Sequence, residues 1–180
     1  MNTDVHNEAP SSAPGLDDET IAFAQRVFQH ARAGNAQDLA ELFDAGLPLN
    51  LRNDKGDTLL MLASYHGHTE VVRLLMERGA DAEIANDRGQ TPLAAAAYQG
   101  DMATVLALLQ LGADVNGSSP GGRTALMTAA MFNRTEILDR LLAAGANPNA
   151  RDADGRTAED AARIMGAEDT AARLAQARSA

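Results

Sequence analysis

Two histidines stand close together in the segment His66-Gly67-His68, and such a pair could bind a metal ion. A structural zinc ion takes four protein ligands, and a catalytic zinc ion takes three. The sequence offers no evident third ligand for this pair, and it contains no cysteine that could bind zinc, form an iron–sulfur cluster or act as a nucleophile. We therefore interpret both histidines as structural residues and predict no metal site.

A glycine-rich segment, residues 117–122, is the second candidate for chemistry, because such loops can bind phosphate. A P-loop also needs a lysine followed by serine or threonine, and this segment has no lysine. His6 and His30 form no recognisable set with an acid and a nucleophile. The sequence thus predicts no catalytic residue, no cofactor and no enzyme activity, and we interpret the glycine-rich segment as a flexible hairpin tip.

The elements that carry these residues repeat along the chain with a period of 33 residues. Four series of identical residues keep this period in one register, which indicates a protein built of stacked repeats. The series are Gly56, Gly89, Gly122 and Gly155; Thr58, Thr91, Thr124 and Thr157; Ala63, Ala96, Ala129 and Ala162; and Gly46, Gly79, Gly112 and Gly145.

The sequence pattern of each repeat predicts a tight turn followed by two short helices. Thr91 followed by Pro92 is typical of a helix start, because threonine caps the first turn and proline fits the first helical position. Gly67 and Gly100 suit the left-handed end of this helix, and Asn133 takes the same place one repeat later. A second helix follows, with its apolar residues on one face.

Several segments of the repeat combine into a recognisable pattern. Its parts are Gly-Gln-Thr-Pro-Leu at 89–93, Ala96, Gly100, Leu108-Leu109 and Gly-Ala-Asp-Val-Asn at 112–116. This pattern resembles the ankyrin-repeat family, and the resemblance extends over about residues 18–175. It implies an all-α solenoid in which each unit is a β-turn and two antiparallel helices.

The resemblance implies five units in one repeat domain, residues 18–180. Before it, residues 1–17 are acidic and rich in Pro, Ser, Asn and Ala without periodicity, so we interpret them as a disordered tail. The units are an N-terminal cap at 18–52, full repeats at 53–85, 86–118 and 119–151, and a C-terminal cap at 152–180. The first cap is expected to begin with a longer helix, residues 18–33. The second is expected to be polar outside, because Glu159, Thr170 and Arg173 replace apolar residues of the inner repeats.

The sequence departs from the family pattern at one position. The histidine of the family's Thr-Pro-Leu-His motif is replaced in the successive units by Met61, Ala94, Met127 and Asp160. Apolar packing must then take the place of the hydrogen bonds normally attributed to that histidine. We expect an intact fold that is less stable than a consensus array.

The resemblance also implies a protein-binding surface on the concave face, formed by the hairpin tips and the exposed side of each first helix. Both tyrosines of the chain and one of its four phenylalanines fall in this strip, and exposed aromatic residues carry much of the affinity in protein interfaces. The alternative is that these rings pack sideways as part of the groove wall. The protein-binding residues expected at the tips and on the helices are Asp54, Lys55, Asp57, Tyr65, His66, Asp87, Arg88, Gln90, Tyr98, Gln99, Arg123, Met131 and Phe132.

The composition of the 180-residue chain restricts its partners and its location. The formal net charge is −10, and clustered basic residues are what nucleic acids and anionic membranes require. No apolar run is long enough to span a membrane, and no secretory signal is visible. We therefore expect a cytoplasmic monomer that binds a protein. The 37 alanines and 14 arginines, both encoded by GC-rich codons, indicate a bacterial source.

Three functions fit this sequence. The first is a non-catalytic interaction module, meaning an adaptor, inhibitor or regulator that holds a protein partner. The second is a regulatory subunit dedicated to one bacterial enzyme, which differs from the first only in the number of partners. The third is a secreted effector that acts on host proteins, with the acidic tail as export signal. We take the first as the main hypothesis and keep the second as its alternative, because sequence does not show the number of partners. The third is less favoured, because the tail is short and unremarkable.

Overall fold

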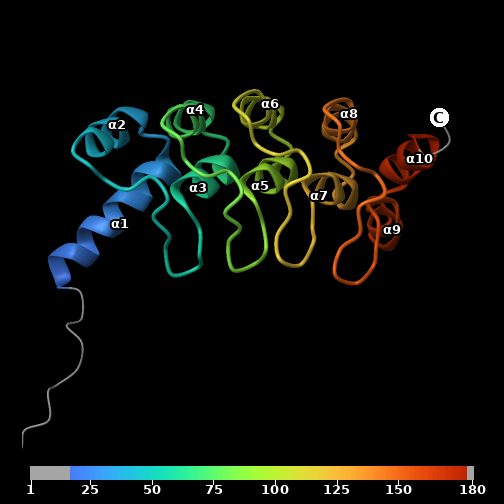
Figure 1. Cartoon of the computed structure of the whole chain (residues 1–180), viewed down its shortest axis with the longest axis horizontal. Helices are drawn as coiled ribbons and strands as arrows, with labels where there is room; N and C mark the ends of the chain where they lie inside the picture. The colour runs from blue at the N-terminus through green and yellow to red at the C-terminus, as the bar shows by residue number, and fades with distance from the viewer. Residues whose placement is uncertain (1–16, 178–180) are drawn as a thin grey trace, which may run out of the picture.

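The computed structural model describes residues 17–177, which form ten α-helices arranged in pairs along one row. Figure 1 shows the pairs stacked side by side in chain order, with a hairpin loop before the first helix of each pair after the first. The first helix of each pair, which we call the inner helix, is α1 (Asp18–Ala33), α3 (Leu59–His66), α5 (Pro92–Gln99), α7 (Ala125–Met131) or α9 (Ala158–Ile164). The outer helices are α2 (Ala36–Asp44), α4 (Thr69–Glu77), α6 (Met102–Gln110), α8 (Thr135–Ala143) and α10 (Glu168–Ala177).

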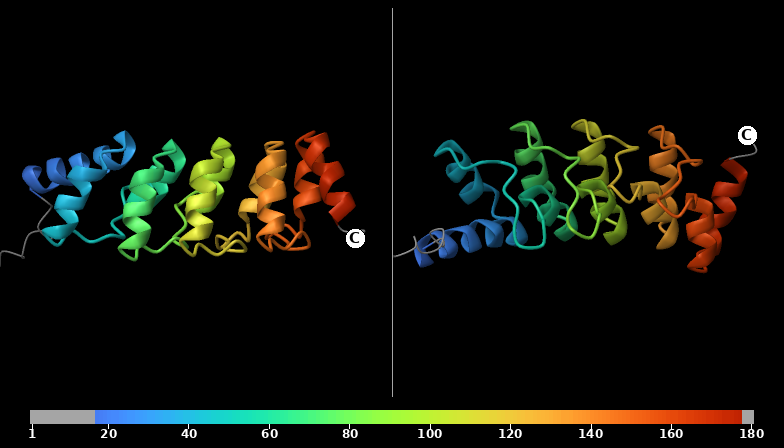
Figure 2. Two further views of the ribbon diagram at one scale, coloured as in Figure 1. Left: turned by 90° about the horizontal axis from the view of Figure 1, so that it is seen from above. Right: turned by 60° about the horizontal axis from the view of Figure 1, so that its bottom comes forward.

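The helices form two layers in Figure 1, with α4, α6 and α8 in a row above α3, α5 and α7. Figure 2 shows from two further directions that each pair stands beside the next. Each inner helix packs against the inner helix of the following unit. The alanines of the repeating series, Ala63, Ala96, Ala129 and Ala162, have no exposed surface. A methyl group at these positions lets two helix backbones approach closely, which explains why the chain is rich in alanine.

The helix ends follow the predicted signals. The hydroxyl of Thr58 accepts a hydrogen bond from the backbone N–H three residues later, and the threonines that begin α5, α7 and α9 do the same. Gly67 and Gly100 end α3 and α5 with positive φ. Asn133 takes the left-handed conformation after α7, with φ of 53°, which confirms its predicted place in the series.

The first helix has the predicted bounds, and its cap lies one residue earlier. Asp17 Oδ1 accepts a hydrogen bond of 2.7 Å from the backbone N–H of Thr20, so Asp17 caps α1. The hydrogen bond holds the pKa of Asp17 below its usual range. The remainder of the predicted tail, residues 1–16, lies outside the described residues.

Hydrogen bonds at the period of the repeat tie each unit to the next. In the loop that leads from each outer helix to the next hairpin, Asn50 Oδ1 accepts from the backbone N–H of Asp81 at 3.0 Å. Asn116 Oδ1 accepts from the N–H of Asn147 at 2.8 Å in the same way. At the hairpins, the backbone N–H of Asp87 donates to Lys55 O. These bonds fix the position of one hairpin relative to its neighbour.

The C-terminal unit differs from the predicted polar exterior. Glu159 and Thr170 are buried, and Arg173 is exposed. The Thr170 hydroxyl donates to the backbone oxygen of Ala130 at 2.7 Å, and Glu159 pairs with Arg163. The prediction was wrong for Glu159 and Thr170 because their positions face the packed interior, where hydrogen bonds satisfy the polar groups. None of the helices within residues 17–177 combines the length and apolar character needed to cross a membrane.

Candidate protein-binding face

The last turns of α3, α5 and α7 place three aromatic side chains in a row. The rings of Tyr65 and Tyr98 are stacked, with their centroids 6.1 Å apart and their planes 14° apart. Tyr98 then meets Phe132 edge to face, with centroids 4.6 Å apart. The rings therefore pack sideways against one another, and Phe132 still keeps 39% of its surface exposed. We call this row, Tyr65, Tyr98 and Phe132, the aromatic ladder.

Three shallow hollows lie near the aromatic ladder, two of them lined by its rings, and together with the ladder they form what we call the groove face. The first hollow, of about 190 Å³, includes Lys55, Tyr65 and Arg88 in its lining. The second, of about 110 Å³, includes Tyr98 and Arg123. The third, of about 570 Å³, lies among the hairpin tips and includes Arg88 and Arg123. Arg88 lines both the first and the third hollow, and Arg123 lines both the second and the third, so the three hollows adjoin one another.

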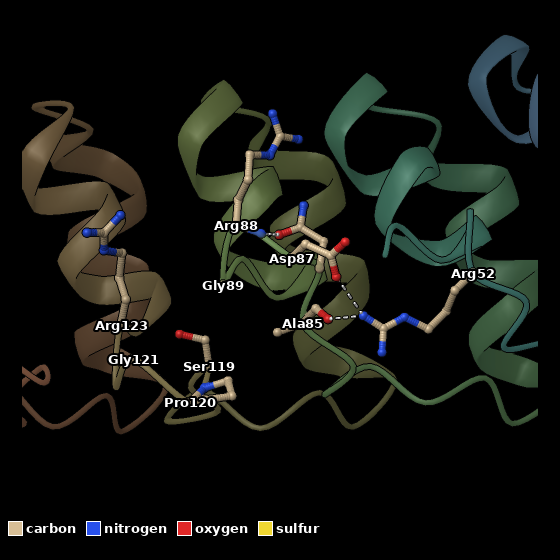
Figure 3. A pocket seen from close by; sticks show the side chains of 10 residues that line it. Arg52, Ala85, Asp87, Arg88, Gly89, Ser119, Pro120, Gly121 and Arg123 are labelled. Atoms are coloured by element: carbon tan, nitrogen blue, oxygen red, sulfur yellow. Dashed lines mark hydrogen bonds and ion pairs between the residues drawn. The ribbon is translucent and has the colours of Figure 1, made fainter. Parts of the chain in front are cut away.

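Three arginines line the third hollow, and of these only Arg52 forms an ion pair within residues 17–177. Arg52 Nη2 donates to the backbone oxygen of Ala85 at 3.1 Å and lies 3.5 Å from Asp87 Oδ1. Figure 3 shows both contacts as dashed lines, whereas no such line reaches the guanidinium groups of Arg88 and Arg123. Arg52 is thus used to join two hairpins, and the other two guanidinium groups are available to a ligand.

The acidic residues of the groove face are already engaged. Asp57 is 4% exposed, and its Oδ1 accepts a hydrogen bond of 2.8 Å from Asn86 Nδ2 of the next hairpin. Asn53 Nδ2 donates to the other oxygen. Asp57 therefore supports the hairpins from inside, rather than offering its carboxylate to solvent as expected of a tip residue.

Of the two histidines, His68 has a clear structural role. Its Nε2 donates to the backbone oxygen of Arg32 at 2.7 Å, which joins the second unit to the first. His66 lies beside it, with ring centroids 6.1 Å apart, and lines the first hollow. Burial lowers the pKa of His66, and the charges of His68 and Arg32 lower it further. Within residues 17–177, no three His, Asp or Glu side chains gather as a metal ion would require.

The structure distributes the predicted site residues over the three hollows. The first hollow is lined by Lys55, Asp57, Tyr65, His66 and Arg88, and the second by Gln90, Tyr98, Arg123, Met131 and Phe132. Asp87 lines the third, with Arg88 and Arg123. Asp54 and Gln99 are exposed and line none of these three hollows.

Sequence reasoning missed three residues of this surface. Arg32 lines the first hollow, and Ile164 and Met165 extend the strip beyond Phe132 with 66% and 51% of their surfaces exposed. Arg32 and Ile164 stand in the same 33-residue series as Tyr65, and Met165 stands in the series of His66. Extending the period into the two terminal units would have found them.

The chain matches known repeat proteins over most of the described helices. A family model described as "Ankyrin repeats (3 copies)" matches residues 27–119, more than half of the chain, and one for "Ankyrin repeats (many copies)" matches residues 108–162. An ankyrin repeat protein of Pseudomonas aeruginosa is 59% identical over 64 residues, which cover 36% of this chain and 37% of that protein. Together with the five helix pairs and their period of 33 residues, these matches show that the chain belongs to the ankyrin-repeat family.

Proposed function

We propose that this chain is a non-catalytic interaction module, an adaptor, inhibitor or regulator that holds a protein partner on its groove face. The aromatic ladder is the observation that carries the proposal. Ankyrin repeats are typically protein-binding modules, and partly exposed aromatic rings are common anchors of protein interfaces. The chain would act as a monomer, and in the cytoplasm, where a protein without cysteine loses no stabilising disulfide.

The packing of the ladder favours binding because it reduces the entropic cost of ordering these side chains when a partner binds. Each ring of Tyr65, Tyr98 and Phe132 is held by its neighbour in the row. The hairpins beside them are fixed by bonds such as that from Asn86 to Asp57. Immobilising a free side chain on binding costs about 0.5–1.5 kcal/mol, and a surface that is already ordered avoids much of that cost.

The test is affinity capture from a native bacterial lysate, with proteins identified by mass spectrometry. We expect the variant Tyr65→Ala/Tyr98→Ala/Phe132→Ala to lose the partner that the unmodified chain retains. The matched control is Ile21→Ala/Phe23→Ala, which removes two similarly exposed apolar side chains from α1, away from the ladder. Circular dichroism would establish that both variants fold.

Equal capture of the same proteins by the ladder variant and the unmodified chain would contradict the proposal. The number of captured partners carries further information. A single stoichiometric enzyme would identify the chain as a dedicated regulatory subunit, and several partners would identify it as an adaptor.

A further inference from the structure

The side chains of the groove face change in chemical type along the row of repeats. The residues at the last turn of each inner helix read, from the N-terminal unit to the C-terminal unit, Arg32, Tyr65, Tyr98, Met131 and Ile164. The next position in each unit reads Ala33, His66, Gln99, Phe132 and Met165. A cation therefore occupies one end of the strip, and aliphatic side chains occupy the other.

The N-terminal end of the groove face holds cations that have no acidic partner. Among the described residues, the side chains of Arg32, Lys55 and Arg88 form no ion pair, and all three line the first hollow. Other cations of the described residues do form ion pairs, as Arg78 does with Asp44, but what distinguishes this hollow is that three unpaired cations line it together. Asp57 lines the same hollow, but asparagines already bond to both of its oxygens.

A carboxylate from outside the molecule fits this end. Arginine binds a carboxylate through two parallel hydrogen bonds, and such charge-assisted bonds are stronger than neutral ones. The ring of His66 in the same hollow has a lowered pKa, so it is neutral near pH 7 and can accept or donate a hydrogen bond there.

The C-terminal end of the groove face is apolar and exposed. Phe132, Ile164 and Met165 have 39%, 66% and 51% of their surfaces exposed. They are three of the five large apolar side chains that the described residues leave exposed. In the 33-residue register, Ile164 continues the series of Tyr65, and Phe132 and Met165 continue the series of His66. Apolar side chains gathered on one exposed strip are typical of a protein-binding surface.

The distance between the two ends sets the length of the segment that could bind both. Packed helices lie about 8–10 Å apart, so the three steps from α3 to α9 cover about 24–30 Å. An extended chain advances about 3.3 Å per residue. About seven to nine residues therefore separate a group bound at the first hollow from a group bound at Ile164.

From these observations, and resting on the function proposed above, we propose that the groove face binds an extended acidic segment of a partner protein. Its carboxylates bind Arg32, Lys55 and Arg88. An aliphatic or aromatic side chain, about seven to nine residues away along the segment, packs on Phe132, Ile164 and Met165. Nucleic acid fits this chain less well, because binding a phosphate backbone requires many clustered basic residues and the formal net charge here is −10.

Fluorescein-labelled peptides test this proposal by fluorescence anisotropy. Each peptide carries a glutamate triplet and a Leu-Phe pair, separated by about seven glycine and serine residues, and both orders along the chain are used. We expect one order to bind, and its dissociation constant to rise with salt concentration. Lys55→Glu/Arg88→Glu is expected to weaken binding about tenfold or more, because charge-assisted hydrogen bonds are lost and repulsion replaces them.

The matched control is Arg73→Glu/Arg140→Glu. It makes the same change of charge on α4 and α8 of the outer layer, where both arginines are exposed and form no ion pair among the described residues. We expect it to leave peptide affinity unchanged apart from a small effect of net charge. Ile164→Ser/Met165→Ser is expected to reduce the affinity of the full peptide to that of a peptide without the Leu-Phe pair.

Four results would overturn the proposal. Two concern the peptide: equal binding when lysine replaces glutamate, and equal binding when the glutamates adjoin Leu-Phe. The third is displacement of the peptide by oligothymidylate at equal concentration, and the fourth is tighter peptide binding after deletion of residues 1–16. The third would indicate a phosphate site, and the fourth would identify the chain's own acidic segment as occupant.

Lysate capture separates this proposal from the function on which it rests. If the aromatic-ladder variant loses its partner and Lys55→Glu/Arg88→Glu retains it, the groove face binds a protein, but not through an acidic segment. If neither variant loses the partner, the proposed function fails as well.

Discussion

Glu83 Oε1 accepts a hydrogen bond of 3.0 Å from the backbone N–H of Asp114, in a series where the equivalent bonds are made by asparagines. Asn50 and Asn116 stand one period before and after it. An asparagine accepts the same bond without a charge. Burial raises the pKa of Glu83, and nearby Asp114 and Asp81 add to this rise, although the hydrogen bond opposes it.

Replacing Glu83 by glutamine should therefore change the pH dependence of stability. A carboxyl group whose pKa is higher in the folded state binds more protons there, so the unmodified chain loses stability as pH rises through that pKa. Glu83→Gln should remove this loss and be more stable than the unmodified chain at pH 7. Urea unfolding at pH 4 and pH 7 measures the difference, with Glu77→Gln on the exposed side of α4 as control. An equal decrease in the free energy of unfolding from pH 4 to pH 7 in Glu83→Gln and in the unmodified chain would contradict the expectation.

The ring of His66 should titrate at a higher pH when Arg32 is neutralised. The charge of Arg32 contributes to the lowered pKa of His66, after burial and His68. Arg32→Gln leaves the backbone oxygen that binds His68 in place, so the fold should persist. NMR titration of the imidazole protons measures the pKa, and Arg26→Gln on the same helix is the control. An unchanged pKa would mean that the guanidinium group does not act on this ring.

The buried hydroxyl of Thr170 should contribute measurably to stability. It donates to Ala130 O at 2.7 Å and has no exposed surface. Thr170→Val keeps the shape and removes the donor, so we expect a loss of about 1–2 kcal/mol in the free energy of unfolding. Thr170→Ser, which keeps the hydroxyl, should lose less. Urea unfolding measures both, and a larger loss for serine would show that the methyl group matters more than the hydrogen bond.

Asn133 should resist replacement by glycine, although glycine is the residue that its backbone conformation favours. Its side chain accepts from the N–H of Thr170 at 3.2 Å and donates to Asp169 Oδ2 at 2.8 Å. Asn133→Gly would relieve the positive φ and lose both bonds, with a net loss of about 1 kcal/mol expected. Thermal unfolding and hydrogen exchange at the Thr170 amide measure the effect. A melting temperature at or above that of the unmodified chain would contradict it.

The local parts of this fold could be predicted because their causes lie close together in the sequence. Thr58 caps the turn that directly follows it, and Gly67 ends the helix that directly precedes it. The period of 33 residues then carries each such signal to the other units. This explains why the repeat and its helix ends were accessible without a structure.

The bonds between units could not be predicted, because their partners are about one repeat apart in sequence. Asp57 is a charged residue in a hairpin, which suggests an exposed side chain. It is buried because Asn86 of the next hairpin lies against it and donates a hydrogen bond to its carboxylate. Thr170 is likewise polar, as expected on the exposed surface of a terminal unit. It is buried because α10 packs on α7, where the Thr170 hydroxyl donates to a backbone oxygen. Arg32 was missed because its helix was interpreted as a cap, although it keeps the register of Tyr65.

The aromatic ladder also gives the protein an optical probe of its own. The chain contains no tryptophan, and its two tyrosines are the stacked pair Tyr65 and Tyr98. Tyrosine fluorescence therefore arises from the groove face alone. A partner that covers these rings, or a bend that separates one repeat from the next, would change the emission without any label attached.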